Sequence, residues 1–382
     1  MAIVPRYFDF NATTPMSEAA RQIWLETAAK HWQNPSSLYR EAGEARRLLD
    51  DHREQLADYF AINDPERVVF TSGATEANNA VIRHLADYES RVLAVSGIEH
   101  PCVQAAVEAF FPEGRIRRIP VNAETGVIDL AVLERWIRNG EVGAVSVMAA
   151  NNETGALQPW REISRLCRET GIRFHTDAAQ WIGKNAVPGL EQGDFVTGSG
   201  HKFGGGKGVG FLLLPEDSAD LNFHSLIGGP QEEGRRAGTE NLPGIAAMVT
   251  ALIERGENAL AEIGRTQEGH RSQFEDAIEN EIGCRILAAN APRLWNTSMF
   301  IMPQAKNLKW LTRLSQRGFC VSTGSACSAG KGNPSAVMMA MGLDFEEMGR
   351  VIRVSGGWET AASDWEALTT AFLEISAELR DQ

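Results

Sequence analysis

The sequence has few cysteines, and their spacing is not that of a structural framework. Its five cysteines include no CxxC pair, in which two residues separate two cysteines. An odd number without such pairs gives neither a disulfide framework nor a zinc knuckle, so we expect no metal ligands. Free thiols persist in reducing compartments, and a cytoplasmic protein is therefore expected.

Long apolar segments and an excess of basic charge are also missing. The longest apolar run, Val142–Ala150, is as long as a strand and too short to cross a bilayer. Residues Met1–Phe10 lack the pattern of a signal peptide. Lys and Arg number 37 against 50 Asp and Glu, a net charge of −13. This balance argues against direct nucleic-acid binding and against a basic membrane-surface helix.

Short apolar runs alternate with helical patterns through the middle of the 382 residues. This alternation is typical of an α/β domain with a mostly parallel sheet. The predicted strands are Arg67–Thr71, Arg91–Ser96, Ala144–Ala149, Ile172–Thr176, Asp194–Thr197 and Val209–Leu214.

The pattern changes after about residue 242. A long helix is predicted over Leu242–Ile263, followed by strand-like pieces and further helices. We therefore expect a large domain over 15–255. A smaller α+β domain is expected to combine 1–14 with 256–382.

Polar side chains follow five of the predicted strands. In an open parallel sheet, ligands bind beyond the carboxyl ends of the strands. We therefore expect these side chains to meet at one edge of the sheet. They are Ser72–Thr75, Glu99 and His100, Asn151–Glu153, Asp177 and Gln180, and Ser199–Lys202.

Each of these groups also has a simpler interpretation. Ser72–Thr75 fits an ordinary helix N-cap as well as an anion site built from backbone N–H groups. His100 taken alone fits a surface or core histidine, and Asp177 with Lys202 fits an ion pair. The glycine-rich stretch 204–208 matches neither a Walker A loop nor a dinucleotide motif, so it predicts a turn packed around a ligand.

A phosphate site, an aspartate and a lysine together suggest pyridoxal phosphate. That cofactor needs a lysine for its Schiff base and an acid that keeps its ring nitrogen protonated. Asp177 and Lys202 stand at the ends of consecutive predicted strands. His100 could then stack on the ring, and Gln180 could donate to the ring oxygen.

A series of motifs runs through nearly the whole chain: Phe8–Pro15, Asn34–Ser37, Thr71–Asn79, Glu99–Pro101, Asn151–Gly155, His175–Gln180, Gly200–Phe203, Gly228–Glu232, Arg235–Asn241 and Gly324–Cys327. In this order they resemble the cysteine desulfurases, pyridoxal-phosphate enzymes of the class V aminotransferase group. The resemblance implies the α/β fold of fold-type I transferases. That fold has a large, mostly parallel-sheet domain and a smaller α+β C-terminal domain.

The resemblance also implies the role of each cofactor residue. Lys202 would hold the cofactor and move the Cα proton, and Asp177 would pair with the ring nitrogen. His100 would stack on the ring and take part in proton transfer. Gln180 and Asn152 would contact the cofactor oxygen.

Phosphate and substrate contacts are implied in the same way. The phosphate would be bound by Ala74, Thr75, Ser199 and His201. Thr239 would reach the phosphate in the other subunit of a homodimer. Arg353 would bind the carboxylate of L-cysteine, which suits a bidentate guanidinium, and Asn11 would help to hold the substrate.

Cys327 lies in a stretch, 322–332, that is too rich in Gly and Ser for a helix or core strand. A loop is predicted there, before a helix over Ser335–Met341. By the resemblance, its thiolate attacks the substrate sulfur, alanine leaves, and a persulfide passes to an acceptor protein. The other cysteines are interpreted as structural: Cys102, Cys167, Cys284 and Cys320.

Two alternatives stay open. One is another class V reaction, such as that of a selenocysteine lyase or a small-amino-acid aminotransferase. The other is a sulfur carrier without catalysis. The sequence does not identify the sulfur acceptor. It also does not identify the pathway, which could be iron–sulfur assembly or the thiolation of tRNA or DNA.

Three positions depart from the expected pattern. Phe10 stands where Asn is usual, and Gly206 stands where Pro is usual. Trp358 lies in a segment where a less bulky sequence is expected, which suggests a place at the substrate mouth.

Overall fold

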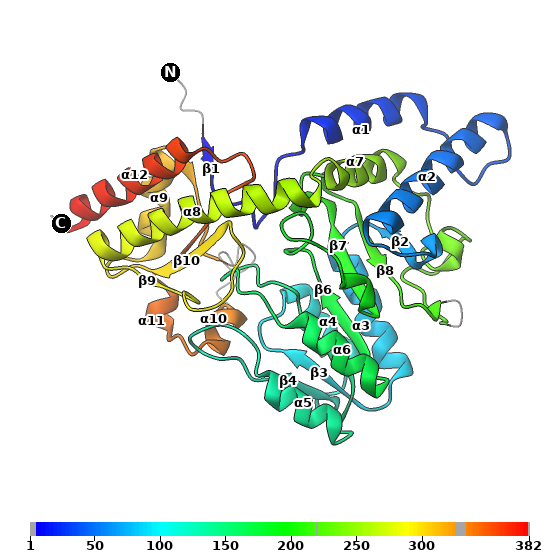
Figure 1. The fold of residues 1–382 in the computed structure, drawn as a ribbon, viewed down its shortest axis with the longest axis horizontal. Coiled ribbons are helices and arrows are strands. Elements are labelled where there is room, and N and C mark those ends of the chain that lie inside the picture. Colours follow the sequence, from blue (N-terminus) through cyan, green and yellow to red (C-terminus); the bar gives the residue numbers. More distant parts are fainter. Residues whose placement is uncertain (1–4, 219–220, 325–333, 381–382) are drawn as a thin grey trace.

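A computed structural model describes residues 5–218, 221–324 and 334–380 (Figure 1). Its main sheet has seven strands in the order β2-β8-β7-β6-β5-β3-β4. Only β8 runs antiparallel to its neighbours, β2 and β7. The mostly parallel α/β prediction is confirmed. The strands are β2 Val68–Thr71, β3 Val92–Ser96, β4 Ile116–Ile119, β5 Val142–Ser146, β6 Arg173–Asp177, β7 Phe195–Ser199 and β8 Gly210–Leu213.

The edge strand β4 is the one that the apolar pattern misses. It carries Arg117 and Arg118 between its two isoleucines. Only the last residue of β4 is buried, so this strand does not need a continuous apolar run. By contrast, every position of β2 at the other edge, and of β5, β7 and β8, is buried.

Helices connect and cover these strands. Two helices precede the sheet, α1 Glu18–Lys30 and α2 Arg40–Tyr59. The crossovers use α3 Ala74–Tyr88, α4 Pro101–Phe110, α5 Leu130–Arg138 and α6 Trp160–Thr170. The single long helix predicted over Leu242–Ile263 is wrong. The chain forms α7 Leu242–Ile253 and α8 Glu257–Ile282 instead, and Gly256 interrupts the helical pattern as the N-cap of α8.

The rest of the described chain has its own sheets. β9 Arg285–Ile286, β10 Thr297–Ile301 and β12 Val351–Ser355 form an antiparallel sheet. β1 Arg6–Tyr7 pairs with β11 Phe319–Cys320. The helices here are α9 Asn307–Gln316, α10 Ala336–Ala340, α11 Phe345–Met348 and α12 Ala362–Arg380. These small sheets lie outside residues 15–255, and the main sheet lies inside that range. We therefore keep the division into a large domain, 15–255, and a small domain, 1–14 with 256–382, as a proposal.

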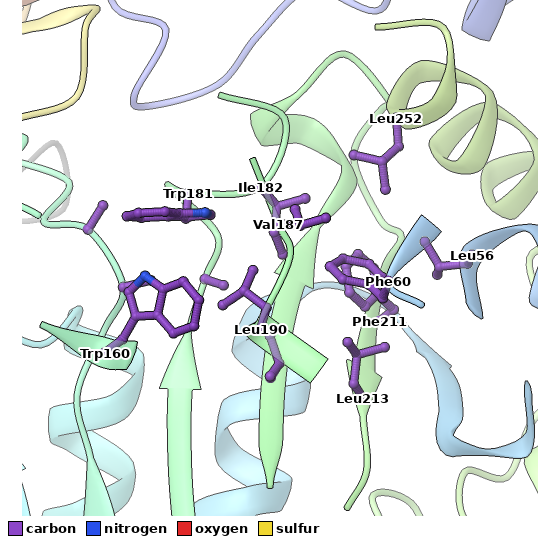
Figure 2. Packing of buried hydrophobic residues seen from close by; sticks show 14 of the residues in the cluster. Leu56, Phe60, Trp160, Trp181, Ile182, Val187, Leu190, Phe211, Leu213 and Leu252 are labelled. Atoms are coloured by element: carbon purple, nitrogen blue, oxygen red, sulfur yellow. The ribbon is translucent and has the colours of Figure 1, made fainter. Parts of the chain in front are cut away.

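Two aromatic cores hold these parts. Under the main sheet, Trp160 meets Trp181 edge to face at 5.5 Å between ring centroids, and Phe60 packs on Phe211 at 5.4 Å (Figure 2). The second core, around Phe274, lies where α8 and α12 pack against β10. Figure 1 shows α8 crossing the molecule from α7 to the side of α9 and α12. Trp181 and Ile182, in the turn after β6, belong to the first core, and the same turn carries candidate site residues.

Candidate active site

One cavity of about 560 Å³ opens at the carboxyl ends of the main strands. Residues that follow all five singled-out strands line it, so the predicted convergence is confirmed. Its size is that of a small-molecule site. Its lining includes Ala74, Thr75, His100, Asn152, Asp177, Gln180, Ser199, His201 and Lys202.

The N-terminus of α3 forms one wall of the cavity. Its N-cap is Gly73, and no side chain caps the first turn. The ordinary N-cap interpretation of Ser72–Thr75 is therefore wrong, because the first N–H groups of the helix are not covered by a capping side chain. Such groups at a helix N-terminus attract anions.

Polar and positive side chains face the same corner. Ser199 lies beside Gly73, since a Cβ on that glycine would meet Ser199 Oγ at 3.4 Å. His201 lines the same cavity with Lys207, which the sequence reasoning did not single out. Burial, reinforced by the charges of Lys202 and Lys207, lowers the pKa of His201 to about 4. The corner is thus a helix N-terminus beside two lysines, which suits a phosphate.

Asp177 is the last residue of β6, and both of its carboxylate oxygens accept hydrogen bonds. The backbone N–H of Ala179 donates to Oδ1 at 3.0 Å, and Asn78 Nδ2 donates to Oδ2 at 2.7 Å. Hydrogen bonds of this kind stabilise an ionised carboxylate. The Asp177 carboxylate is therefore held in one orientation at the cavity wall.

Lys202 ends the short 3-10 helix η4, Gly200–Lys202, directly after β7. Its Nζ donates to the backbone carbonyls of Asn11 at 2.6 Å and Ala12 at 2.9 Å. Gln180 Nε2 donates to the same Asn11 carbonyl at 2.9 Å. The N-terminal segment thus brings the lysine and the glutamine to one point of the cavity wall.

His100 is the N-cap of α4. Its Nδ1 accepts the backbone N–H of Cys102 at 3.2 Å and lies 3.0 Å from the Cys102 sulfur. Burial lowers the pKa of His100. The ring is therefore neutral at physiological pH with its proton on Nε2, the nitrogen that Cys102 does not contact.

Cys102 lines the cavity, but its thiol is poorly suited to nucleophilic attack. Burial, together with the charge of Asp177, raises the pKa of its thiol to about 12. A thiol protonated at neutral pH reacts poorly. Cys167 and Cys284 are buried, whereas Cys320 is exposed.

Arg353 and Asn11 lie outside the cavity lining. Arg353 Nη2 donates to Asp9 Oδ1 at 2.6 Å, and its Nη1 donates at 2.8 Å to the carbonyls of Asn152 and Gly324. Its buried Nε finds no acceptor in the described part of the chain. This leaves one donor of Arg353 for a further acceptor.

The side chain of Asn11 is committed within the protein. Its Nδ2 donates to Thr297 Oγ1 at 2.8 Å and to the Asn152 carbonyl at 3.2 Å. Its Oδ1 accepts from Lys184 and Asn296. This differs from the expected substrate contact, because no polar atom of the amide is left over. Asn11 instead positions Lys202 through its backbone.

The other two predicted residues do not appear in the cavity lining for different reasons. Cys327 falls outside the described residues. Thr239 is exposed and does not line the cavity of its own chain.

Asn78 and Lys184 are supporting residues that the sequence reasoning missed. Asn78 is fully buried on α3, and Lys184 is a buried lysine in the turn after β6. Neither follows a strand directly. The available signals were an amide four residues into a helix and a lysine directly after an apolar stretch, 181–183. Both signals are weak.

The departures from the family pattern have structural explanations. Trp358 is buried and donates from Nε1 to the Gly183 carbonyl, so its expected place at the substrate mouth is wrong. Phe10 packs edge to face on it at 6.0 Å. Gly206 has φ +86°, which the ring of proline does not allow.

Comparisons with known proteins identify the family of the chain. A model of the class V aminotransferases matches residues 6–368. A cysteine desulfurase of Cereibacter sphaeroides is 35% identical over 98% of this chain and 96% of its own. Cysteine desulfurase IscS of Dictyoglomus turgidum is 33% identical over 98% and 95%.

Solved structures give the same result. A NifS-like protein from Rickettsia africae superposes with a TM-score of 0.87 at 30% identity, over 98% of this chain and 99% of its own. SspA in complex with cysteine gives 0.79 at 30% identity, over 92% and 98%. The fold is thus that of a fold-type I enzyme. The chain belongs to the class V aminotransferase family and, within it, to the cysteine desulfurases.

Proposed function

We propose that the protein removes sulfur from L-cysteine, releases L-alanine and holds the sulfur as a persulfide on Cys327. The carbon–sulfur bond of the substrate breaks and a sulfur–sulfur bond forms, while the proton of the substrate thiol ends on the carbon of alanine. The observation that carries the proposal is the meeting of Lys202, Asp177 and the anion corner in one cavity.

The residues of the cavity fit pyridoxal phosphate. The N-terminus of α3 with Ser199 and His201 suits its phosphate, and the doubly bonded carboxylate of Asp177 suits its ring nitrogen. Lys202 is the lysine that the cofactor requires. When bound, the cofactor supplies an electron sink for the charge that develops at the substrate Cα.

The chain's own groups would do the rest. Lys202 Nζ would take the proton from Cα, starting from its place on the Asn11 and Ala12 carbonyls. His100, neutral with its proton on Nε2, would stack on the ring and donate that proton. Gln180 would donate from Nε2 to the ring oxygen, and Asn152 would contact the same oxygen.

Arg353 would bind the substrate carboxylate. Its support is a buried guanidinium that holds the Asn152 carbonyl and keeps one donor, Nε, without an acceptor in the described ranges. A carboxylate is a strong acceptor for such a donor. The Asp9 carboxylate fixes the opposite side of the guanidinium.

A homodimer and a sulfur acceptor complete the proposal. Thr239 is exposed and does not line its own cavity, as expected of a residue serving the partner's phosphate site. Large apolar side chains are exposed on and after α1 and in the segment before Thr239, which favours a covered face. They include Trp24, Trp32, Leu38 and Ile227. The acceptor would be a protein, and an iron–sulfur assembly or thiolation pathway would receive the sulfur.

The location proposed is the cytoplasm. The described part of the chain contains no helix long and apolar enough to cross a membrane. Its cysteines Cys102, Cys167, Cys284 and Cys320 are all free thiols, which suits a reducing compartment.

The test compares two cysteine variants of the cofactor-loaded protein. Cys327→Ala should bind the cofactor normally and make no alanine from cysteine. Cys320→Ala, an exposed cysteine seven residues away, is the matched control and should keep wild-type turnover. Full turnover by Cys327→Ala would contradict the proposal. Amino transfer to a keto acid would favour the aminotransferase alternative, and turnover of selenocysteine alone would favour a lyase.

A further inference from the structure

Lys184 is a buried lysine beside the cavity whose partners are all uncharged. It is 2% exposed, and its Nζ donates to Gln180 Oε1 at 2.5 Å and to Asn11 Oδ1 at 3.2 Å. Within the described ranges no carboxylate forms an ion pair with it. A buried charge without a counter-charge is costly, so this position calls for an explanation.

The nearest charges add to that cost. Lys202 and Arg353 are both positive, and they act with burial, the largest cause, to lower the pKa of Lys184 well below its ordinary value. A neutral amine has two N–H donors, and two acceptors are present. The two N–H donors of the neutral group are therefore matched by Gln180 and Asn11.

Both acceptors are amides whose two ends differ in chemistry. Because Lys184 donates to Gln180 Oε1, the Gln180 amide must turn its Nε2 toward the Asn11 carbonyl and the cavity. A flipped amide would place an oxygen against the Asn11 carbonyl oxygen and offer an acceptor to the cavity. Lys184 also donates to Asn11 Oδ1, next to Asn296 Nδ2 at 3.1 Å.

The backbone of Lys184 is anchored independently of these bonds. Trp295 Nε1 donates to the Lys184 carbonyl at 2.9 Å, and Trp358 Nε1 donates to the neighbouring Gly183 carbonyl at 2.8 Å. Two buried indoles thus hold the turn in place. The side chain of Lys184 is consequently free to act on the amides rather than to maintain the turn.

We infer that Lys184 is a positioning residue: it fixes the amides of Gln180 and Asn11 so that a donor, Gln180 Nε2, faces the cofactor oxygen. The same bonds hold the Asn11 segment, whose carbonyl accepts Lys202 Nζ at 2.6 Å. The inference rests on the proposed cofactor site. It assigns Lys184 no contact with substrate or cofactor.

The test is a double-mutant cycle with Lys184→Met and Gln180→Met. Lys184→Met keeps the chain length and removes both N–H donors. It should raise the dissociation constant of pyridoxal phosphate about tenfold and shift the pH midpoint of the cofactor absorbance by about one unit. In the Gln180→Met background, the change in dissociation constant should fall below about twofold and the shift of the pH midpoint below about 0.3 unit, because the two residues act as a unit.

Additive effects in the two backgrounds would overturn the inference, and so would a Lys184→Met protein that binds the cofactor unchanged. Lys309→Met, an exposed lysine on α9, is the control and should change neither readout. If Lys184→Met does not fold, Lys184→Gln takes its place in the cycle, since it lacks the reach of the amine. Wild-type protein that acquires no visible absorbance would overturn the proposed function as well.

Discussion

Asn78 Nδ2 donates a hydrogen bond to Asp177 Oδ2 at 2.7 Å. The contacts of the amide oxygen fix this orientation of the Asn78 side chain. Its Oδ1 accepts from Thr197 Oγ1 at 2.6 Å and faces His175 Nε2 at 3.1 Å. Two donors on the oxygen leave only the NH2 group for the carboxylate. α3 therefore contributes to both ends of the cofactor site, the phosphate corner and the aspartate.

The first prediction concerns this amide. Asn78→Ala removes one of the two donors to Asp177 and leaves the buried Thr197 and His175 without their acceptor. We expect about tenfold weaker binding of pyridoxal phosphate, and about 1–3 kcal/mol less stability, in an absorbance titration and a urea melt. The neighbouring Asn79→Ala, on a more exposed amide, should change neither by much. Unchanged cofactor affinity in Asn78→Ala would contradict the role of the amide.

Glu99 gives a pH-dependent prediction. Its carboxyl is buried, and burial raises its pKa to about 8 although Ser96 and the Met148 N–H donate to Oε1. Between the ordinary pKa and about 8, the folded protein keeps this proton and the unfolded chain loses it. The free energy of unfolding therefore falls as pH rises, by up to about 1.4 kcal/mol per pH unit from this group.

Glu99→Gln should remove this contribution. The amide keeps the oxygen that accepts the two donors and cannot ionise. Urea melts between pH 5 and 8 should show a less negative slope of unfolding free energy against pH in the variant. Parallel curves for variant and wild type would mean that Glu99 is ionised in the folded protein.

Gly206 replaces the expected proline for a backbone reason. Its φ of +86° is far from the value near −65° that a proline ring imposes. Gly206→Pro should cost at least about 2 kcal/mol in a urea melt, even though it restores the usual residue. Gly206→Asn, which tolerates positive φ, should lose only about 1 kcal/mol. A proline variant as stable as wild type would show that this turn is wrongly described.

Phe10 and Gly357 form one packing unit. A Cβ on Gly357 would lie 2.2 Å from the Phe10 ring, so Gly357→Ala should destabilise the protein by about 1–3 kcal/mol. Phe10→Ala removes the obstacle. The double variant should therefore lose less stability than the sum of the single losses, measured by thermal or urea unfolding. If the stability losses of the single variants simply add in the double variant, the two positions do not form a packing unit.

Residues that directly follow strands could be predicted from the sequence. Asp177 and Ser199 end their strands, and His100 and Lys202 come within four residues of a strand end. The geometry of a parallel sheet brings such residues together whatever the details of packing. The motif resemblance then supplied their chemistry.

Residues that act through others could not be predicted in this way. Asn78 lies inside a helix and Lys184 in a turn, and their roles depend on which neighbours the fold brings within 3 Å. The break at Gly256 was missed because apolar spacing continues on both sides of it. Trp358 was misplaced because a bulky residue near a site motif can equally well be part of the core.

The central claim is sulfur transfer to Cys327, and the intact mass of the cofactor-loaded protein tests it most directly. The protein is exposed briefly to L-cysteine without reductant, and the added mass is mapped by peptide analysis. We predict one added sulfur atom, on the peptide that contains Cys327, and none in Cys327→Ala. A loaded protein that gains no sulfur, or gains it on Cys102 or Cys320, would contradict the account.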